Sequence, residues 1–300
     1  MTRVRQFERL GESLKVLAPA KLNLSLLIAG KRPDGFHEIE TVMAAIDWYD
    51  ELLIQPGERS GIELACRGPQ WAPTGPENLV YRAAERILSR AGRTAAVRLT
   101  LTKNVPAGSG LGSASSDAAA TLMGLNEFLD LGLSKRDLMQ TAAEIGSDVA
   151  FFLDGPLALC TGKGEKITRL QAEFNFTALL ITPNISVSTE KVYKHYAHDA
   201  QQYERLSKPI RAHLKKNRID LVAKMCANML SGTCFSLFQE LGQLKKTVES
   251  LGVEPVCLSG SGSTLFSILD HHDMERLGPV RDEITEKAGC ESIVVRNCRL

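Results

Sequence analysis

Residues 106–121 join a glycine-rich loop to the start of an alanine-rich segment, and they constrain the fold more than any other stretch. They read PAGSGLGSASSDAAAT and follow the alternating apolar residues Val97, Leu99 and Leu101. This order predicts a strand, a tight loop and a helix N-terminus. Glycines let the backbone approach a ligand closely, and the first N–H groups of a helix are unpaired and partly positive, so the two together bind phosphate. The alternative is an ordinary glycine turn that caps a helix.

Two common nucleotide-binding motifs are absent from this loop. No Gly-Lys-Ser/Thr ends it, and its glycines do not have the GxGxxG spacing of a dinucleotide fold. The loop therefore favours phosphate binding of another type.

Length, charge and cysteine use exclude several classes of protein. A chain of 300 residues is long enough for two domains, and its net charge of +1 gives no electrostatic footprint for nucleic acid or an acidic membrane. No apolar run approaches the roughly 18 residues of a membrane span, and the charged first residues do not resemble a signal peptide. The 7 cysteines are scattered, which is typical of reduced thiols. We therefore expect a cytoplasmic protein with no nucleic-acid or membrane partner.

The first half of the chain has the pattern of mixed strands and helices. Residues 20–27 alternate, so Lys21, Asn23 and Ser25 share the polar face of a strand. A turn at 32–35 follows, and the remaining segments have helix or strand periodicity. These are strands at 39–46 and 50–54, a helix at 78–90, a helix from Ser134 to Gly146, and a hairpin of 157–160 with 166–170.

This arrangement predicts the positions of two polar residues. Asp148 comes directly after the predicted end of a helix at Gly146, so it is expected at the mouth of that helix C-terminus. Lys163 stands between two glycines, and we interpret it as a turn residue rather than a phosphate ligand.

The second half predicts a smaller α+β unit, with a domain boundary near residue 170. Its predicted elements are a strand at 177–182, a polar segment of uncertain order at 196–215, helices at 217–230 and 235–251, a strand–turn–strand at 256–266, a helix at 273–288 and a strand at 292–296.

Three motifs in order resemble one superfamily of small-molecule kinases, the galactokinase, homoserine kinase, mevalonate kinase and phosphomevalonate kinase superfamily. They are Ala18–Leu24, Pro106–Ala120 and Leu258–Gly262. Within it, PAKLNLSL, the segment Lys31–Glu38 and the segment Ile145–Phe152 resemble the 4-diphosphocytidyl-2-C-methyl-D-erythritol kinases. The chain departs from the family pattern in two places: Ser113-Ala114 stands where members usually carry Gly-Gly, and Asn228–Ser231 stands where they carry Asn-Asp-Leu-Glu.

The resemblance implies an α+β, two-domain small-molecule kinase fold. Residues 1–170 would form an N-terminal ribosomal-protein-S5-like α/β domain that binds ATP and holds the catalytic groups. Residues 171–300 would form a C-terminal ferredoxin-like α+β domain on the substrate side. The reaction would move the γ-phosphoryl of ATP, accompanied by Mg²⁺, to the 2-hydroxyl of 4-diphosphocytidyl-2-C-methylerythritol in the non-mevalonate route to isoprenoid precursors. The partner is then a small molecule, no protein metal site is expected, and a monomer or weak homodimer suffices.

The resemblance also implies roles for individual residues. Asp148 would accept or orient the substrate hydroxyl, and Lys21 would place a positive charge beside it, which keeps a carboxylate ionised. Asn23, Phe36, His37, Thr189 and Tyr193 would bind the acceptor, with Phe36 and Tyr193 stacked on cytosine and His37 at its polar edge. The cofactor-binding loop would consist of Pro106, Ala107, Gly108, Ser109, Gly110, Leu111, Gly112, Ser113, Ala114, Ser115 and Ser116.

Two other functions remain open from the sequence. A superfamily kinase for mevalonate or homoserine would not need aromatic residues around a base. An ATP-binding module without catalysis would not need both Lys21 and Asp148.

Overall fold

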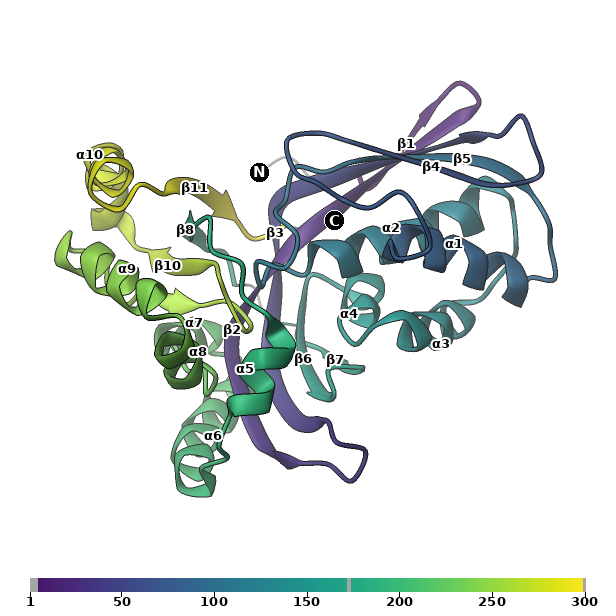
Figure 1. The fold of residues 1–300 in the computed structure, drawn as a ribbon. Helices are drawn as coiled ribbons and strands as arrows, with labels where there is room; N and C mark the ends of the chain where they lie inside the picture. Colours follow the sequence, from purple (N-terminus) through teal and green to yellow (C-terminus); the bar gives the residue numbers. More distant parts are fainter. Residues whose placement is uncertain (1–4, 172–173, 299–300) are drawn as a thin grey trace.

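The computed structural model describes residues 5–171 and 174–298, which form two sheets with helices packed on them (Figure 1). The larger sheet has the order β1-β2-β3-β5-β4, with β6 and β7 attached to β3. The smaller sheet has the order β11-β8-β10-β9. The predicted boundary near residue 170 falls between the last strand of the first sheet and the first strand of the second.

The larger sheet is built on one long antiparallel hairpin, β2 (Ser13–Lys31) and β3 (His37–Pro56). The prediction of two separate strands at 39–46 and 50–54 is wrong. Residues 47 and 48 lie between the paired positions Pro19↔Tyr49 and Ala20↔Ile46, so they form a bulge and the strand continues through it. The other strands are β1 (Phe7–Leu10), β4 (Gly61–Arg67), β5 (Ala96–Thr102), β6 (Leu157–Gly162) and β7 (Lys166–Arg169).

Four helices cover one face of this sheet: α1 (Leu79–Arg90), α2 (Ser113–Phe128), α3 (Lys135–Ile145) and α4 (Val149–Asp154) (Figure 1). Asn78 caps α1 through the amide of Val80, and Ser134 forms a capping box with Asp137 at the start of α3. The predicted starts of both helices are therefore confirmed. Apolar side chains of the sheet and helices form a buried core between them.

The second half contains β8 (Thr177–Thr182), β9 (Cys257–Leu258), β10 (Leu265–Leu269) and β11 (Glu291–Arg296). Its helices are α5 (Thr189–His195), α6 (Ala200–Lys215), α7 (Ile219–Lys224), α8 (Ser231–Leu237), α9 (Gln239–Ser250) and α10 (His271–Ala288). The α+β class predicted for this half is confirmed.

Three segments of this half differ from prediction. The polar segment at 196–215 contains a helix, α6, which Asp199 caps through the amide of Gln202. The helix predicted at 217–230 ends at Lys224, because Cys226 adopts a left-handed φ of 49° and the chain then pairs with Leu26 of β2. The helix predicted at 235–251 is the end of α8 followed by α9.

β2 belongs to both halves of the molecule. Its first apolar side chains, from Leu14 to Ala18, pack in the core beneath α1 and α2. Its later ones, from Ala20 to Ile28, pack in the core of the second half. The polar face of β2 therefore lies where the two halves meet.

One expectation about the cysteines is wrong. Cys226 and Cys257 form a disulfide, with their Cα atoms 5.3 Å apart. They are 31 residues apart in sequence, and they meet because the segment after α7 runs between β2 and β9. In the residues that the structure describes, no helix combines the length and the apolar character needed to cross a membrane.

Candidate active site

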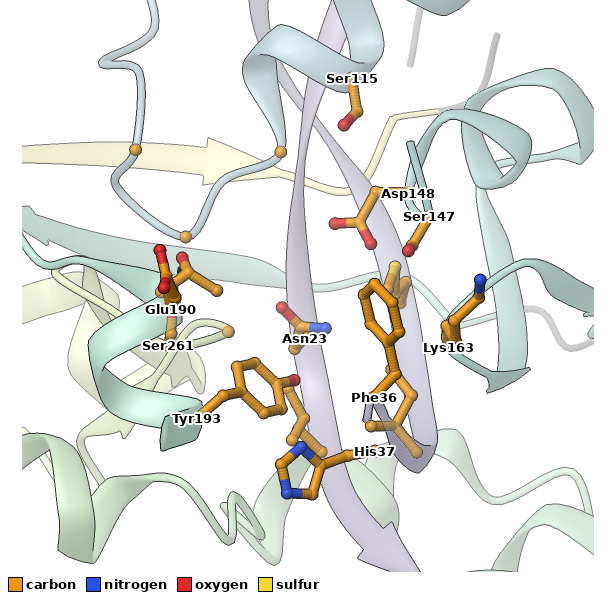
Figure 2. Close-up of a pocket in the computed structure, with 18 of the residues that line it drawn as sticks. Asn23, Phe36, His37, Ser115, Ser147, Asp148, Lys163, Glu190, Tyr193 and Ser261 are labelled. Atoms are coloured by element: carbon orange, nitrogen blue, oxygen red, sulfur yellow. Dashed lines mark hydrogen bonds between the residues drawn. The ribbon is translucent and has the colours of Figure 1, made fainter. Parts of the chain in front are cut away.

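The residues predicted for the site converge on one cavity of about 850 Å³, which the loop before α2, the β2–β3 hairpin and α5 enclose (Figure 2). Both predicted catalytic residues, all five predicted acceptor residues and six loop residues line it. They are Lys21, Asn23, Phe36, His37, Gly108, Gly110, Gly112, Ser113, Ala114, Ser115, Asp148, Thr189 and Tyr193. The other five loop residues do not line the cavity: Pro106, Ala107, Ser109, Leu111 and Ser116.

The glycines of the loop have the conformation that only glycine adopts easily. Gly108, Gly110 and Gly112 have φ values of 68°, 82° and 68°. Gly112 is the N-cap residue of α2 and offers no capping side chain, so the first amides of α2 are left for a ligand. A Cβ at Gly110 would lie 2.1 Å from the carbonyl oxygen of Ser259. The loop therefore presents backbone to the cavity at close range.

The third motif supports this loop from the second half of the chain. The Ser259 hydroxyl donates to the Gly110 carbonyl at 2.9 Å, and the Thr264 amide donates to the Ser109 carbonyl at 3.0 Å. The side-chain amide of Asn228 donates to the carbonyls of Leu258 and Gly260, at 2.9 and 2.8 Å. Asn228 was noted only for its altered motif, and its structural role could not be read from the sequence because its partners lie 30 and 32 residues away.

Lys21 connects the loop to the predicted acid–base residue. Its ammonium donates to Asn23 Oδ1 at 2.5 Å and to the Gly110 carbonyl at 2.7 Å, and it lies 3.9 Å from Asp148 Oδ2. The side chain is only 4% exposed. Burial lowers the pKa of Lys21, and the charge of Asp148 opposes that shift. A lysine so enclosed supplies a positive charge at a defined position.

Asp148 lies between two helix ends rather than only at the C-terminus of one. Gly146 is the C-cap residue of α3, as predicted, and Asp148 is the N-cap residue of α4. Its carboxylate accepts no capping bond from α4, and its side chain is 29% exposed toward the cavity (Figure 2). A carboxylate that faces a cavity can accept a proton from a bound hydroxyl.

The opposite end of the cavity is aromatic. The rings of His37 and Tyr193 have centroids 5.3 Å apart, and Tyr196 meets His37 edge-on at 5.9 Å. Phe36 is 56% exposed, and its ring borders the cavity across from Tyr193 (Figure 2). Burial, together with the charges of Lys31 and His198, lowers the pKa of His37, which favours the neutral imidazole. A neutral imidazole both donates and accepts hydrogen bonds.

The cavity also contains residues that sequence reasoning missed. Lys163 lies in the turn between β6 and β7, as predicted, and its ammonium is also 4.8 Å from the centre of the Phe36 ring at the cavity wall. It reaches there because β6 pairs with β3, in the register Ile39↔Gly162. Sequence pattern carries no signal for such a long-range pairing. The further lining residues include Lys31, Ser147, Glu190, Lys194, Tyr196 and Ser261.

Comparison with known proteins identifies the family of the chain. Residues 78–156 match the model of the GHMP kinases N terminal domain, and residues 210–278 match that of the GHMP kinases C terminal. A 4-diphosphocytidyl-2-C-methyl-D-erythritol kinase of Citrifermentans bemidjiense is 34% identical over 288 residues, which cover 95% of this chain and 99% of the relative. The enzyme of that name from Chloroherpeton thalassium is 38% identical, over 85% of this chain and 89% of its own.

Solved structures of similar proteins have the same fold. The crystal structure of a 4-(cytidine 5'-diphospho)-2C-methyl-D-erythritol kinase superposes with a TM-score of 0.74 and 32% identity, and the match covers 94% of this chain and 98% of that one. A homoserine kinase from Cytophaga hutchinsonii superposes with a TM-score of 0.77, at 22% identity and over 99% and 98% of the two chains. The second likeness shows that the fold is shared.

Proposed function

The chain belongs to the 4-diphosphocytidyl-2-C-methyl-D-erythritol kinase family of the GHMP kinases, and on that basis we propose how its residues carry out the reaction. The protein is a phosphotransferase that uses ATP and acts on a small molecule. Its reaction moves the γ-phosphoryl of ATP to the 2-hydroxyl of 4-diphosphocytidyl-2-C-methyl-D-erythritol, in the synthesis of isoprenoid precursors. The hydroxyl oxygen bonds to the γ-phosphorus while the bond to the bridging oxygen of ADP breaks, and the hydroxyl proton leaves.

The glycine loop is proposed to hold the phosphates of ATP. Its lining residues present backbone N–H groups and the N-terminus of α2, which favour negative charge. Ser115 lines the cavity and can add a hydroxyl contact, whereas Ser116 is only 1% exposed and does not line it. Of these two loop serines, the geometry favours Ser115.

Asp148 and Lys21 are proposed to act on the transferring group. Phosphoryl transfer depends mainly on positioning and charge stabilisation rather than on covalent chemistry by the protein. Asp148 would orient the acceptor hydroxyl and take its proton. Lys21, held against both Asp148 and the glycine loop, would stabilise the negative charge on the γ-phosphoryl oxygens.

The aromatic end is proposed to bind the cytosine, with Tyr193 and Phe36 on its faces and His37 at its polar edge. Between this end and Asp148, the diphosphate of the acceptor passes Lys163. In the described part of the chain, Lys163 forms no salt bridge within 4.0 Å. Its ammonium can therefore pair with a phosphate as well as with the Phe36 ring. Thr189, hydrogen-bonded to Ser261 at 2.8 Å, borders the same space.

Mg²⁺ is proposed to accompany the nucleotide. Within residues 5–171 and 174–298, no cluster of three or more His, Cys, Asp or Glu side chains could hold a metal ion alone. Asp148 and Ser115, which face the same part of the cavity, fit an ion whose remaining ligands are phosphate oxygens and water (Figure 2). When bound, such an ion neutralises charge on the phosphates.

The observation that carries the proposed function is the single cavity that joins a phosphate loop and an acid–base residue to a cluster of aromatic rings. We propose that the enzyme acts as a monomer or a weak homodimer. The test is an ADP-release assay with Mg-ATP and three acceptors: 4-diphosphocytidyl-2-C-methyl-D-erythritol, mevalonate and homoserine. We expect ADP only with the cytidyl acceptor. Turnover of mevalonate or homoserine alone would contradict the proposed acceptor.

A further inference from the structure

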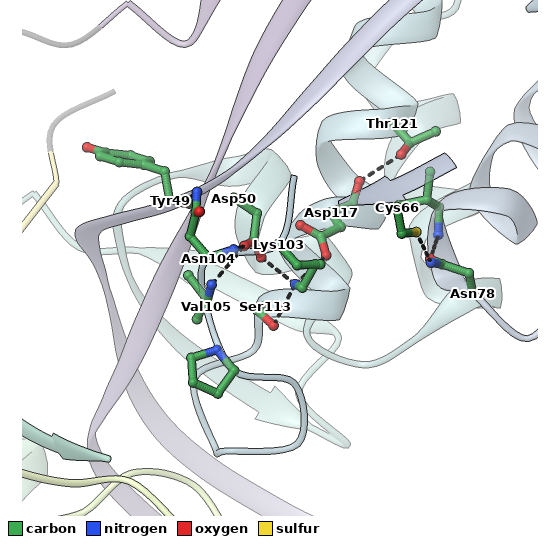
Figure 3. Close-up of polar contacts among 12 residues, drawn as sticks. Tyr49, Asp50, Cys66, Asn78, Lys103, Asn104, Val105, Ser113, Asp117 and Thr121 are labelled. Carbon is green, nitrogen blue, oxygen red and sulfur yellow. Dashed lines mark hydrogen bonds and ion pairs between the residues drawn. The ribbon is translucent and has the colours of Figure 1, made fainter. Parts of the chain in front are cut away.

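A cluster of charged side chains lies buried beneath the glycine loop (Figure 3). It consists of Lys103, at the end of β5, Asp50 of β3 and Asp117 of α2. Their side chains are 1%, 0% and 3% exposed. None of the three lines the cavity, so none is placed to touch either substrate. The reaction described above leaves them without a role.

Asp50 binds the chain where it enters the loop. One of its carboxylate oxygens accepts from the backbone amides of Asn104 and Val105, at 2.6 and 2.9 Å. These residues immediately precede Pro106, the first residue of the loop. The other oxygen forms an ion pair with the Lys103 ammonium. Both oxygens of Asp50 are therefore engaged.

Lys103 binds the chain where it leaves the loop. Its ammonium donates to the Ser113 hydroxyl at 3.0 Å and to Asp117 Oδ2 at 2.8 Å. Ser113 is the first residue of α2, directly after Gly112. Together with Asp50, these contacts use all three donors of the lysine. The two ends of the loop are thus joined through one buried ion pair.

The two carboxylates are not equivalent. Asp117 Oδ1 has no hydrogen-bond partner among the described residues. Burial raises the pKa of Asp117 to about 8, although the charge of Lys103 opposes the shift. Asp50, by contrast, has both carboxylate oxygens engaged, one with Lys103 and one with the amides of Asn104 and Val105.

Buried ion pairs contribute little net stability, because the loss of hydration offsets their attraction. Removing one partner alone is strongly unfavourable, since it leaves a buried charge unpaired. A cluster of this kind is better explained by the geometry that it fixes than by the stability that it adds. Here the geometry in question is that of the loop ends.

We propose that Asp50 and Lys103 are positioning residues that hold the two ends of the glycine loop in the geometry required to bind the phosphates of ATP. They act through the backbone of residues 104–113 and not by contact with substrate. The inference rests on the proposed role of the loop, and it assigns no part to the acceptor end of the cavity.

The test compares Asp50→Asn with Asp117→Asn, which changes the other carboxylate of the cluster, one that contacts Lys103 but not the amides of Asn104 and Val105. Titration calorimetry would measure the dissociation constants of Mg-ATP and of CDP, a probe for the acceptor end, alongside the melting temperature. A misplaced loop should lose about one hydrogen bond to a charged phosphate, so we expect Asp50→Asn to weaken ATP binding by roughly 10- to 100-fold. CDP binding should stay within about twofold of wild type, and Asp117→Asn should bind both ligands nearly normally.

A second control separates positioning from general instability. Thr121 donates its hydroxyl to the Asp117 carbonyl within α2 and is 0% exposed, but it does not contact the loop ends. Thr121→Val should lower the melting temperature without changing the affinity for ATP. Equal ATP affinity in folded Asp50→Asn and wild type would overturn the inference.

If Asp50→Asn does not fold, the double variant Asp50→Asn/Lys103→Met carries the test. It removes both partners of the ion pair together and leaves Asp117 able to take up a proton, so it is expected to fold. Its ATP affinity should still be reduced, and wild-type affinity would again overturn the inference. A wild-type protein that binds ATP but does not phosphorylate the cytidyl acceptor would contradict the proposed acceptor alone.

Discussion

Lys21 Nζ lies 3.9 Å from Asp148 Oδ2 and 2.7 Å from the carbonyl oxygen of Gly110. The two residues come from different elements, β2 and the junction of α3 and α4. Their closeness places the acid–base residue next to the phosphate loop. Mutation of either residue can separate the contribution of Lys21 to the rate from that of Asp148.

Asp148→Asn should retain ATP binding and lose most turnover. Asparagine has nearly the same shape but cannot take a proton, so kcat should fall by about 10²- to 10⁴-fold. Steady-state kinetics with the cytidyl acceptor would measure kcat, and calorimetry would measure ATP affinity. A variant with nearly wild-type kcat would remove Asp148 from the role of base.

The pH dependence of the rate should report the burial of Lys21. Burial lowers the pKa of Lys21, and Asp148 partly offsets the shift. The rate should therefore decline on the alkaline side below the ordinary lysine pKa of 10.5. In Asp148→Asn the offset is lost, so the decline of the residual rate should begin at still lower pH. Glu190→Gln removes another cavity carboxylate and should leave the alkaline decline of the rate at the same pH as in wild type. The same alkaline decline in wild type, Asp148→Asn and Glu190→Gln would contradict this explanation.

Gly110→Ala should raise the KM for ATP. The new Cβ would lie 2.1 Å from the Ser259 carbonyl, so the loop and the third motif must separate. Gly132→Ala is the matched control, because Gly132 also has a positive φ, of 66°, but no atom within 4 Å of the added carbon. Both variants should lose stability from backbone strain, whereas only Gly110→Ala should lose ATP affinity. Unchanged KM in Gly110→Ala would place the nucleotide elsewhere.

Tyr193→Ala should weaken binding of the cytidyl acceptor by about 1–3 kcal/mol, the usual value of one stacking contact with a base. Tyr193→Phe keeps the ring and should bind normally. His37→Ala should lose the preference for cytidine over uridine acceptors, since a group that reads the polar edge of a base penalises the wrong base. Acceptor titrations at saturating ATP would measure the acceptor affinity of each protein. Equal affinities in wild type, Tyr193→Ala and His37→Ala would contradict the cytidyl site.

Lys163→Met should weaken CDP more than cytidine. A positive charge beside a diphosphate strengthens binding of the charged ligand only, and the loss should be roughly 10- to 100-fold for CDP, the range of a hydrogen bond between charged groups. Lys166→Met is the control, because Lys166 lies on β7 and does not line the cavity. If Lys163→Met reduced cytidine and CDP affinity equally, the lysine would act only by holding the Phe36 ring.

Local patterns in the sequence predicted the parts of the fold that local interactions determine. The caps at Asn78 and Ser134, the strand before the loop and the start of α2 follow from residues close to each other in the chain. The bulge at residues 47 and 48 and the early end of α7 depend on pairing with β2, which adjacent residues do not specify.

The same distinction applies to the site. Lys21, Asp148 and the aromatic residues were found because their motifs are continuous in sequence. Lys163 lies in the predicted turn, but its place at the cavity could not be predicted, because only the pairing of β6 with β3 brings it to Phe36. The buried cluster of Asp50, Lys103 and Asp117 was not predicted, since its members lie on three separate elements.

The β2–β3 hairpin runs from one end of the cavity to the other, with register shifts between Asn23 and Ser25 and between Ile28 and Gly30. It carries Lys21 near the glycine loop, and its far end pairs Lys31 with His37 at the aromatic end. A paired ribbon of two long strands keeps its rise of about 3.3 Å per residue, so its length changes little. With the nucleotide and cytosine bound as proposed, this ribbon fixes the distance between the γ-phosphoryl group and the base, and we expect the acceptor to be selected by length as well as by base. A short alcohol without its nucleotide can occupy only one end of that span.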